Sequence, residues 1–150
     1  MLRPSKKLAL ALEAVVDIAC QATLEPVQSL DIGQRMDLPR RYLEQVMQQL
    51  VRAGILKGVR GPRGGYRLAR ERRRITIADV VAVVERVEDD DNSVPTSQSE
   101  LGQRVMTPFW AGIEREFVAK LSTITIEDLC RRAESLDVNG DKPRGMDFSI

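Results

Sequence analysis

Apolar side chains in the first part of the chain recur every three or four positions, which is the period of an amphipathic helix. From Leu8 onward this pattern predicts a first helix over residues 5–22 that ends before Pro26. A short second helix is expected over residues 29–36. The chain is therefore predicted to start as two helices joined by a loop.

A third amphipathic segment, residues 39–54, is separated from the second helix by a tight turn. Pro39 suits its first turn, where a missing N–H costs nothing, Asp37 is a plausible cap, and Gly54 ends the helix. Arginine and glutamine dominate one face of this segment. The apolar face is formed by Leu43, Val46, Met47 and Leu50. Two short helices joined by a tight turn, the second with outward Arg and Gln, predict a helix-turn-helix.

The stretch VRGPRGGYRLAR, residues 59–70, combines four arginines with four Gly or Pro residues. Residues 55–59 and 66–68 predict two short strands joined by a loop whose glycines permit positive φ and close approach of the backbone. A hairpin directly after the second helix of such a pair is a wing, and its tip carries Arg60 and Arg63. A nucleotide-binding P-loop is disfavoured because no Gly-Lys-Ser/Thr follows.

Residues 77–87 form a further apolar-periodic segment, for which Thr76 and Asp79 provide a capping-box-like start. The acidic and polar residues 88–99 predict a loop. The helix over residues 77–87 and the loop that follows it predict that the first folded unit ends near residue 87.

Residues 100–124 predict a long helix that bends near Pro108. Thr125 and Asp128 repeat the capping pattern and open a short helix reaching about Leu136. The long helix carries an apolar stripe made of Val105, Phe109, Trp110, Ile113, Phe117 and Leu121. An apolar stripe that is too large for a small domain to cover usually forms an interface with a partner. In a homodimer, the two recognition helices would lie about one DNA turn apart. The alternative is that the stripe packs back on its own domain.

These elements predict a mainly α (α+β) fold: a winged helix-turn-helix with a two-stranded wing and a long C-terminal dimerisation helix. We divide the chain into a DNA-binding domain (1–87), an acidic and polar loop (88–99), dimerisation helices (100–136) and a flexible tail (137–150).

The net charge of +1 hides a strong segregation of charge. Residues 35–74 hold twelve basic and three acidic side chains, an excess of nine positive charges. Lys6 and Lys7 add to it near the N-terminus, and we count them among the residues expected to contact DNA. A surface of one sign is typical of a protein that binds a polyanion, whereas a solvated helical face usually mixes signs.

Composition excludes other functions. No apolar run approaches the roughly 20 residues that span a bilayer, and Glu13 and Asp17 interrupt the apolar start that imitates a signal peptide. A cytoplasmic protein with no membrane partner is therefore expected. The chain has no histidine, the commonest catalytic base, and no nucleophile–base pair, metal motif or cofactor loop. These absences argue against an enzyme.

The two cysteines, Cys20 and Cys130, are far apart in the sequence and form neither a disulfide framework nor a metal-binding spacing. Cys20 lies on an apolar helix face and is interpreted as a small core residue. Cys130 stands beside Arg131 and Arg132, which favour its thiolate. A redox role for either cysteine remains the alternative.

Residues 40–45 (RRYLEQ), 50–56 and 59–69 (VRGPRGGYRLA) resemble the bacterial IscR-, NsrR- and CymR-type winged-helix regulators. The Ile-Thr-Ile-Ala-Asp-Val-Val start of the next helix is similar as well. The resemblance is strong over residues 1–87 and architectural beyond. It implies a dimeric transcription regulator, expected to be a repressor, on a near-palindromic operator. The DNA-binding positions it implies are Arg40, Arg41, Tyr42, Glu44 and Gln45 in the helix, and Arg60, Arg63, Gly64, Gly65 and Tyr66 in the wing.

The chain departs from this family in one respect. Many members hold an iron–sulfur cluster with three cysteines after the fourth helix, but residues 86–110 contain none here. Cluster ligation needs thiolates or a substitute such as histidine. We therefore expect a cluster-free member with no cofactor and no metal.

The segment DKPRGMDFSI, residues 141–150, resembles the C-terminus of serine acetyltransferases, whose final isoleucine carboxylate enters the active site of cysteine synthase. The resemblance implies that Asp147, Phe148, Ser149 and Ile150 dock into that enzyme and couple DNA binding to cysteine metabolism. The alternative is a protein-interaction module that acts through this tail with little specific DNA recognition.

Overall fold

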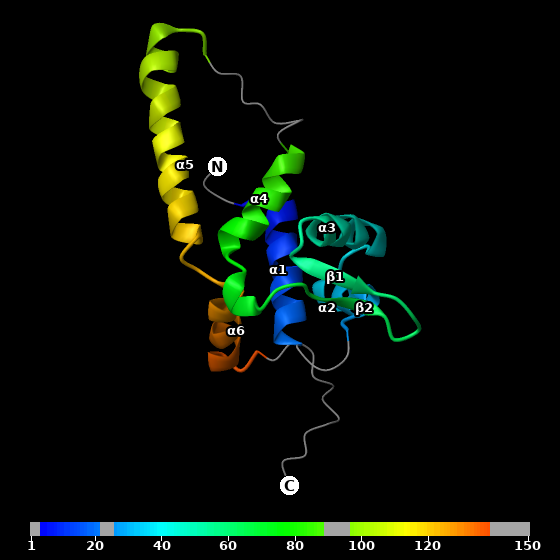
Figure 1. Cartoon of the computed structure of the whole chain (residues 1–150). Helices are drawn as coiled ribbons and strands as arrows, with labels where there is room; N and C mark the ends of the chain where they lie inside the picture. The colour runs from blue at the N-terminus through cyan, green and yellow to red at the C-terminus, as the bar shows by residue number, and fades with distance from the viewer. Residues whose placement is uncertain (1–3, 22–25, 89–96, 139–150) are drawn as a thin grey trace.

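The computed structural model describes residues 4–21, 26–88 and 97–138 (Figure 1). Most of the expected 88–99 loop and the tail residues Asp147, Phe148, Ser149 and Ile150 lie outside these ranges. In chain order the described elements are α1 (Lys6–Cys20), α2 (Ser29–Met36), α3 (Arg40–Arg52), β1 (Leu56–Val59), β2 (Gly65–Leu68), the 3-10 turn η1 (Arg72–Arg74), α4 (Ile77–Glu88), the π-helical turn η2 (Gly102–Met106), α5 (Thr107–Leu121) and α6 (Ile126–Ser135). The predicted mainly helical winged helix-turn-helix fold is confirmed.

The hydrophobic core lies around α1. This helix begins where the Ser5 hydroxyl accepts a hydrogen bond from the Leu8 N–H at 3.2 Å. Its buried face packs against α4, α6 and α3. Each fully buried aliphatic side chain of this core contributes about 1.5–3 kcal/mol relative to leaving it exposed. The core residues contributed by helix α1 are Leu8, Ala11, Ala14, Val15, Ile18 and Ala19.

Both predicted capping patterns are present. At the start of α4, the Thr76 N–H donates to the Asp79 carboxylate at 2.9 Å, and the Asp79 N–H donates to the Thr76 hydroxyl at 3.2 Å. Thr125 and Asp128 form the same reciprocal pair at the start of α6, at 2.9 and 3.1 Å. The hydrogen bond with the Thr125 backbone is the main cause that lowers the pKa of the Asp128 carboxyl. The hydrogen bond with the Thr125 side chain lowers this pKa further.

The starts of α4 and α6 lie side by side. Thr76 and Thr125 form an antiparallel bridge. The Ile77 N–H donates to the Ile124 carbonyl, and the Ile126 N–H donates to the Ile75 carbonyl, both at 2.9 Å. Ile126 is fully buried in the main core. Helix α6 therefore packs onto the first folded unit, although it follows the long α5 helix in sequence.

The turn between α2 and α3 differs from the prediction at Asp37. We expected Asp37 to cap α3, but no side-chain cap hydrogen bond is present at the start of α3. Asp37 instead ends α2 in the left-handed conformation, with φ 52° and ψ 53°, which Asp tolerates better than most residues. Pro39 takes the N-cap position rather than the first turn, and α3 begins at Arg40.

The expected irregularity near Pro108 takes the form of the π-helical turn η2, directly before α5. Proline has no N–H and its ring crowds the carbonyl four residues earlier. The N–H of Thr107 reaches back five residues to the Gly102 carbonyl, and the Thr107 hydroxyl donates to the same oxygen at 3.0 Å. A wider turn therefore precedes the proline.

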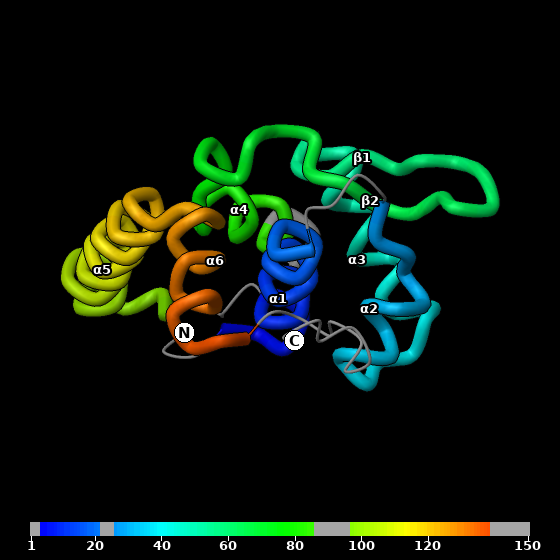
Figure 2. The backbone as a smooth tube through the Cα atoms, turned by 90° about the horizontal axis from the view of Figure 1, so that it is seen from below, coloured from blue at the N-terminus to red at the C-terminus, as the bar shows by residue number. Residues whose placement is uncertain are grey.

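The elements are segregated between two sides of the molecule. Helices α2 and α3 and the β1–β2 hairpin lie on one side, and α5 lies on the opposite side, in both views (Figures 1 and 2). Helix α1 stands between them. None of the described helices has the length and apolar character needed to cross a membrane.

Candidate nucleic-acid interface

Helix α3 presents the polar face that the sequence predicts. Its buried face holds Leu43, Val46, Met47 and Leu50. This burial fixes the helix orientation, so that Arg41, Gln45 and Gln48 are exposed. Arginine and glutamine can make bidentate hydrogen bonds to base edges in a major groove. The exposed face of α3 therefore has the chemistry of a recognition helix.

Arg40 and Glu44 lie one turn apart on α3 and form an ion pair, with 3.0 Å between Arg40 Nε and Glu44 Oε1. The side chains are 69% and 40% exposed. An exposed pair of this kind contributes little to stability. Arg40 can therefore exchange the carboxylate for a phosphate at small cost.

Two of the predicted contact residues, Tyr42 and Tyr66, are partly buried and pack against the hydrophobic core. Burial raises the pKa of Tyr66, and the negative charge of Glu44 raises it further. Glu44 of α3 therefore lies close to the base of the hairpin. The two tyrosines connect the recognition helix and the wing to the core.

The β1–β2 hairpin forms the predicted wing. Leu56 pairs with Leu68 and Val59 with Gly65 in an antiparallel register. The connecting loop turns at Gly61, whose φ of 115° is in the region that favours glycine.

Two further glycines of the wing lie where a side chain would clash with the backbone of the protein itself. A Cβ on Gly64 would lie 2.3 Å from the Val59 carbonyl oxygen, and one on Gly65 would lie 2.4 Å from the Val27 carbonyl oxygen. Both distances are far below van der Waals contact. The glycines at these positions therefore shape the wing, whatever contact they make with DNA.

The wing is also hydrogen-bonded to the segment that precedes α2. Val27 and Tyr66 exchange backbone hydrogen bonds, at 2.9 Å from the Val27 N–H to the Tyr66 carbonyl and 2.7 Å from the Tyr66 N–H to the Val27 carbonyl. This bridge was not predicted from the sequence, because no local pattern marks a single pair of residues so far apart. The bridge holds the start of α2 against the wing.

An open groove runs between the start of α2, the start of α3 and the wing. Arg40 of α3 and Arg60 of the wing both line it. The groove also contains two exposed apolar side chains that sequence reasoning missed, Leu30 at 50% and Val59 at 37% exposure. The lining residues are Gln28, Ser29, Leu30, Arg40, Gly58, Val59, Arg60, Gly61, Pro62, Gly64, Gly65 and Tyr66.

Part of the positive charge counted in the sequence is neutralised locally. Arg35 forms a bidentate ion pair with Asp17, at 2.6 and 3.0 Å, and both side chains are mostly buried. Arg40, Arg70, Arg72 and Arg73 also face carboxylates. Arg41 and Arg60 have no ion pair with any described residue. The cationic surface is therefore smaller than the sequence count, but it includes Arg41 of α3 and Arg60 of the wing.

The remaining predicted contacts are less closely grouped. Arg63 is exposed in the wing loop. Lys6 is exposed and Lys7 is partly buried at the start of α1. The described groove does not include these three residues or Arg41 and Gln45. Arg41 and Gln45 belong to the exposed face of α3, so the candidate interface consists of that face and the groove together.

The predicted apolar stripe on α5 is exposed on the opposite side of the molecule. Phe109 and Trp110 contact each other edge to face, with ring centroids 5.2 Å apart. Leu121, which we included in this stripe, packs against the core instead. Met106 and Val118 are additional exposed apolar residues that the sequence analysis left out. The exposed members of the stripe are Val105 of η2 and Phe109, Trp110, Ile113 and Phe117 of α5.

Comparison with known proteins identifies close similarities over most of the chain. The family model described as "Rrf2: Iron-dependent Transcriptional regulator" matches residues 4–132. The HTH-type transcriptional regulator IscR of Xenorhabdus nematophila is 33% identical over 129 residues, covering 85% of this chain and 79% of the relative. IscR of Photorhabdus laumondii is 32% identical over 131 residues, covering 87% of this chain and 80% of the relative.

Solved structures show the same similarity in three dimensions. T. potens IscR matches with a TM-score of 0.72 and 31% identity, covering 89% of this chain and 90% of that one. CymR, described as the global cysteine regulator of B. subtilis, matches with a TM-score of 0.70 and 30% identity, covering 88% of this chain and 98% of that one. The relatives are transcriptional regulators and not enzymes.

The residues of this chain do not fit an iron–sulfur cluster. Such clusters are held by several thiolates, or by thiolates together with histidines. The chain has two cysteines and no histidine. Cys130 lies in the core and contacts the partly buried Cys20. No group of three His, Cys, Asp or Glu side chains in the described part of the chain could hold a metal ion.

Proposed function

This chain belongs to the Rrf2 family of transcriptional regulators, and from that premise we propose that it is a sequence-specific repressor that binds double-stranded DNA as a homodimer in the cytoplasm, without an iron–sulfur cluster. The observation that carries the proposal is the groove lined by both Arg40 of α3 and Arg60 of the wing. Two cations on different elements that face one open space suit the phosphates of a duplex.

The two parts of the interface have different roles in this proposal. Arg41 and Gln45 on the exposed face of α3 contact base edges and determine the preferred sequence. Arg40, Arg60 and Arg63 contact phosphates and fix the position of the protein on the duplex. The apolar side chains of Leu30 and Val59 pack beside the sugar–phosphate backbone.

Selection of bound sequences from random duplex DNA at physiological salt tests this function. We expect the wild-type protein to select a near-palindromic site. The variant Arg41→Ala should relax the selected sequence, with a loss of discrimination of about 1–3 kcal/mol at the affected base pair. If wild-type protein selects no sequence, the chain is better explained as a protein-interaction module. If Arg41→Ala selects the same site as wild type, another face of α3 contacts the bases.

The exposed apolar stripe of α5 supports the homodimer. Exposed aromatic side chains grouped on one helix face usually mark an interface, and a two-fold symmetric pair of such helices would place the two α3 helices on successive half-sites. Sedimentation equilibrium of the Phe117→Glu variant tests the interface. We expect a monomer, whereas the control Arg115→Glu, on the opposite side of α5, should stay dimeric. A dimeric Phe117→Glu protein would contradict this interface.

A link to cysteine metabolism is the finer part of the proposal. The structural similarity to CymR, described as a global cysteine regulator, favours it, together with the resemblance of residues 141–150 to serine acetyltransferase ends. We propose that Asp147, Phe148, Ser149 and Ile150 bind cysteine synthase. A peptide of residues 141–150 should compete with substrate for that enzyme, and the same peptide without Ile150 should not. Absence of competition by the full peptide would refute this partner.

A further inference from the structure

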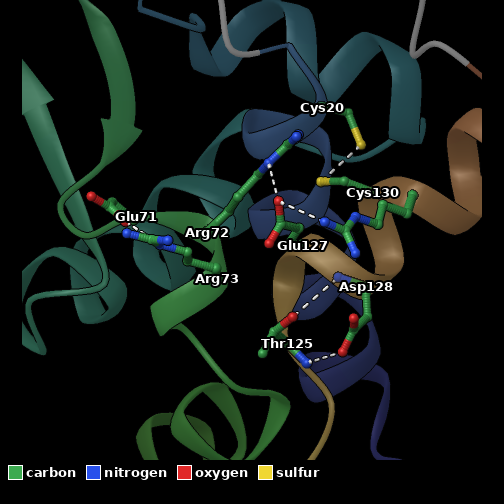
Figure 3. A network of polar contacts seen from close by, with 9 residues as sticks. Cys20, Glu71, Arg72, Arg73, Thr125, Glu127, Asp128 and Cys130 are labelled. Atoms are coloured by element: carbon green, nitrogen blue, oxygen red, sulfur yellow. Dashed lines mark hydrogen bonds and ion pairs between the residues drawn. The ribbon is translucent and has the colours of Figure 1, made fainter.

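The two cysteines of the chain meet at the junction of α1 and α6 (Figure 3). Cys20 is the last residue of α1, and Cys130 lies in the middle of α6. Their sulfur atoms are 3.4 Å apart, although 110 positions separate them in the sequence. Both thiols are reduced in this structure. A covalent bond between them requires the sulfurs to approach to about 2.05 Å.

The two thiols differ in their access to solvent. Cys130 is fully buried in the core, whereas Cys20 is partly exposed at the end of its helix. A small oxidant can therefore reach Cys20, but it can reach Cys130 only through Cys20. This asymmetry corresponds to the two roles in disulfide formation, in which one thiol reacts with the oxidant and the other resolves the product.

The surroundings of Cys20 disfavour the charged form of its thiol. Burial, followed by the hydrogen bond to Cys130 and the charge of Cys130, raises the pKa of the Cys20 thiol to about 12. Asp17 acts in the same direction, and the guanidinium of Arg72 acts in the opposite one. Arg72 is held near this site by Glu127 of α6, at 3.9 Å.

We propose that Cys20 and Cys130 are a reversible modification site, at which a low-molecular-weight disulfide oxidises the two thiols to an intrachain disulfide between α1 and α6. The Cys20 thiol gives up its proton and its sulfur attacks one sulfur of the small disulfide. The S–S bond of the small disulfide breaks, a mixed disulfide forms on Cys20, and the first small thiolate takes up a proton and leaves as a thiol. The Cys130 thiolate then attacks the Cys20 sulfur and releases the second small thiol. The protein loses two electrons and two protons, and the small disulfide gains them as two thiols.

The position of the bond gives it a structural consequence. Helix α1 is the centre of the core, and α6 is joined to α5 by the short segment 122–125. A disulfide would fix α6 on α1 and close a loop of more than a hundred residues, which restricts the unfolded chain strongly. Oxidation should therefore stabilise the folded protein and restrict movement of α6 relative to the first folded unit.

Equilibration of the full-length protein in buffers of reduced and oxidised glutathione tests the proposal. In oxidising buffer, we expect the intact mass of the wild-type chain to fall by two hydrogen atoms, with a cross-linked peptide that contains Cys20 and Cys130. The midpoint of thermal unfolding should rise by about 5–10 °C. Dithiothreitol should reverse both changes.

Two matched variants separate the roles of the thiols. Cys130→Ser should stop the reaction at a mixed disulfide between Cys20 and glutathione, and Cys20→Ser should leave Cys130 unmodified. The proposal is overturned if wild-type protein keeps two alkylatable thiols in fully oxidising buffer, keeps a glutathione adduct, or links two chains. The wild-type peptide map decides the question even if a serine variant does not fold.

Discussion

Replacement of Arg60 by alanine tests whether the wing contacts a phosphate, because the substitution should leave the fold of the wing unchanged. Arg60 is exposed, lines the groove opposite Arg40 and forms no ion pair with any described residue. Its removal leaves Gly61, which makes the turn, unchanged. An exposed side chain of this kind contributes within about 0.5 kcal/mol to the free energy of unfolding. The variant should therefore fold as the wild type does and differ only in DNA binding.

The magnitude follows from the number of phosphates that are neutralised. Each such contact contributes about 0.9 to the slope of the logarithm of affinity against the logarithm of salt concentration. A dimer loses two contacts in the variant, so the slope should fall by about 1.8. Between 50 and 200 mM salt, wild-type protein should therefore lose about tenfold more affinity than the variant.

Fluorescence anisotropy with one labelled duplex at several salt concentrations measures both slopes. Arg115→Ala is the matched control, because it removes an arginine from α5 on the opposite side of the molecule. It should leave the slope unchanged. An unchanged slope for Arg60→Ala, or an equal decrease for Arg115→Ala, would refute a wing contact with phosphate.

Three further substitutions test the framework of the interface. Asp17→Ala leaves the mostly buried guanidinium of Arg35 without its bidentate partner and should lower the free energy of unfolding by about 3 kcal/mol in urea titrations; a change below 0.5 kcal/mol would contradict this. Leu50→Ala, at a fully buried position, should cost about 2–5 kcal/mol in the same assay. Gly65→Ala places a Cβ against the Val27 carbonyl, so it should weaken DNA binding in anisotropy titrations at low salt, and unimpaired binding would show that the wing can shift without loss.

Local chemistry made most of the elements predictable. A cap or a turn depends on residues within about four positions, so Thr76 with Asp79, and Thr125 with Asp128, identified the starts of α4 and α6. Asp37 was misassigned because an aspartate between two helices can either cap the second or end the first. Asp37 adopts the left-handed conformation and therefore ends α2.

Contacts between distant segments were not predictable from the pattern. The Arg35–Asp17 pair removes one cation from the expected surface, and nothing in the local sequence distinguishes Arg35 from an exposed arginine. The Cys20–Cys130 contact was not predicted for the same reason, because the sequence does not show whether two widely spaced cysteines meet in the fold. Leu121 was assigned to the exposed stripe because helical spacing places it there, but the chain turns toward α6 and covers it.

The arrangement of the wing explains how separate elements can act on one duplex. A two-stranded hairpin alone is marginally stable in water. An arginine on a freely moving hairpin would contribute little binding free energy, because its contact with a phosphate would also have to order the loop. The backbone bridge between Val27 and Tyr66, and the packing of Tyr66 on the core, order the base of the wing before DNA binds. We therefore expect the affinity for DNA to depend on glycine at position 65 as well as on Arg40 and Arg60, which line the same groove.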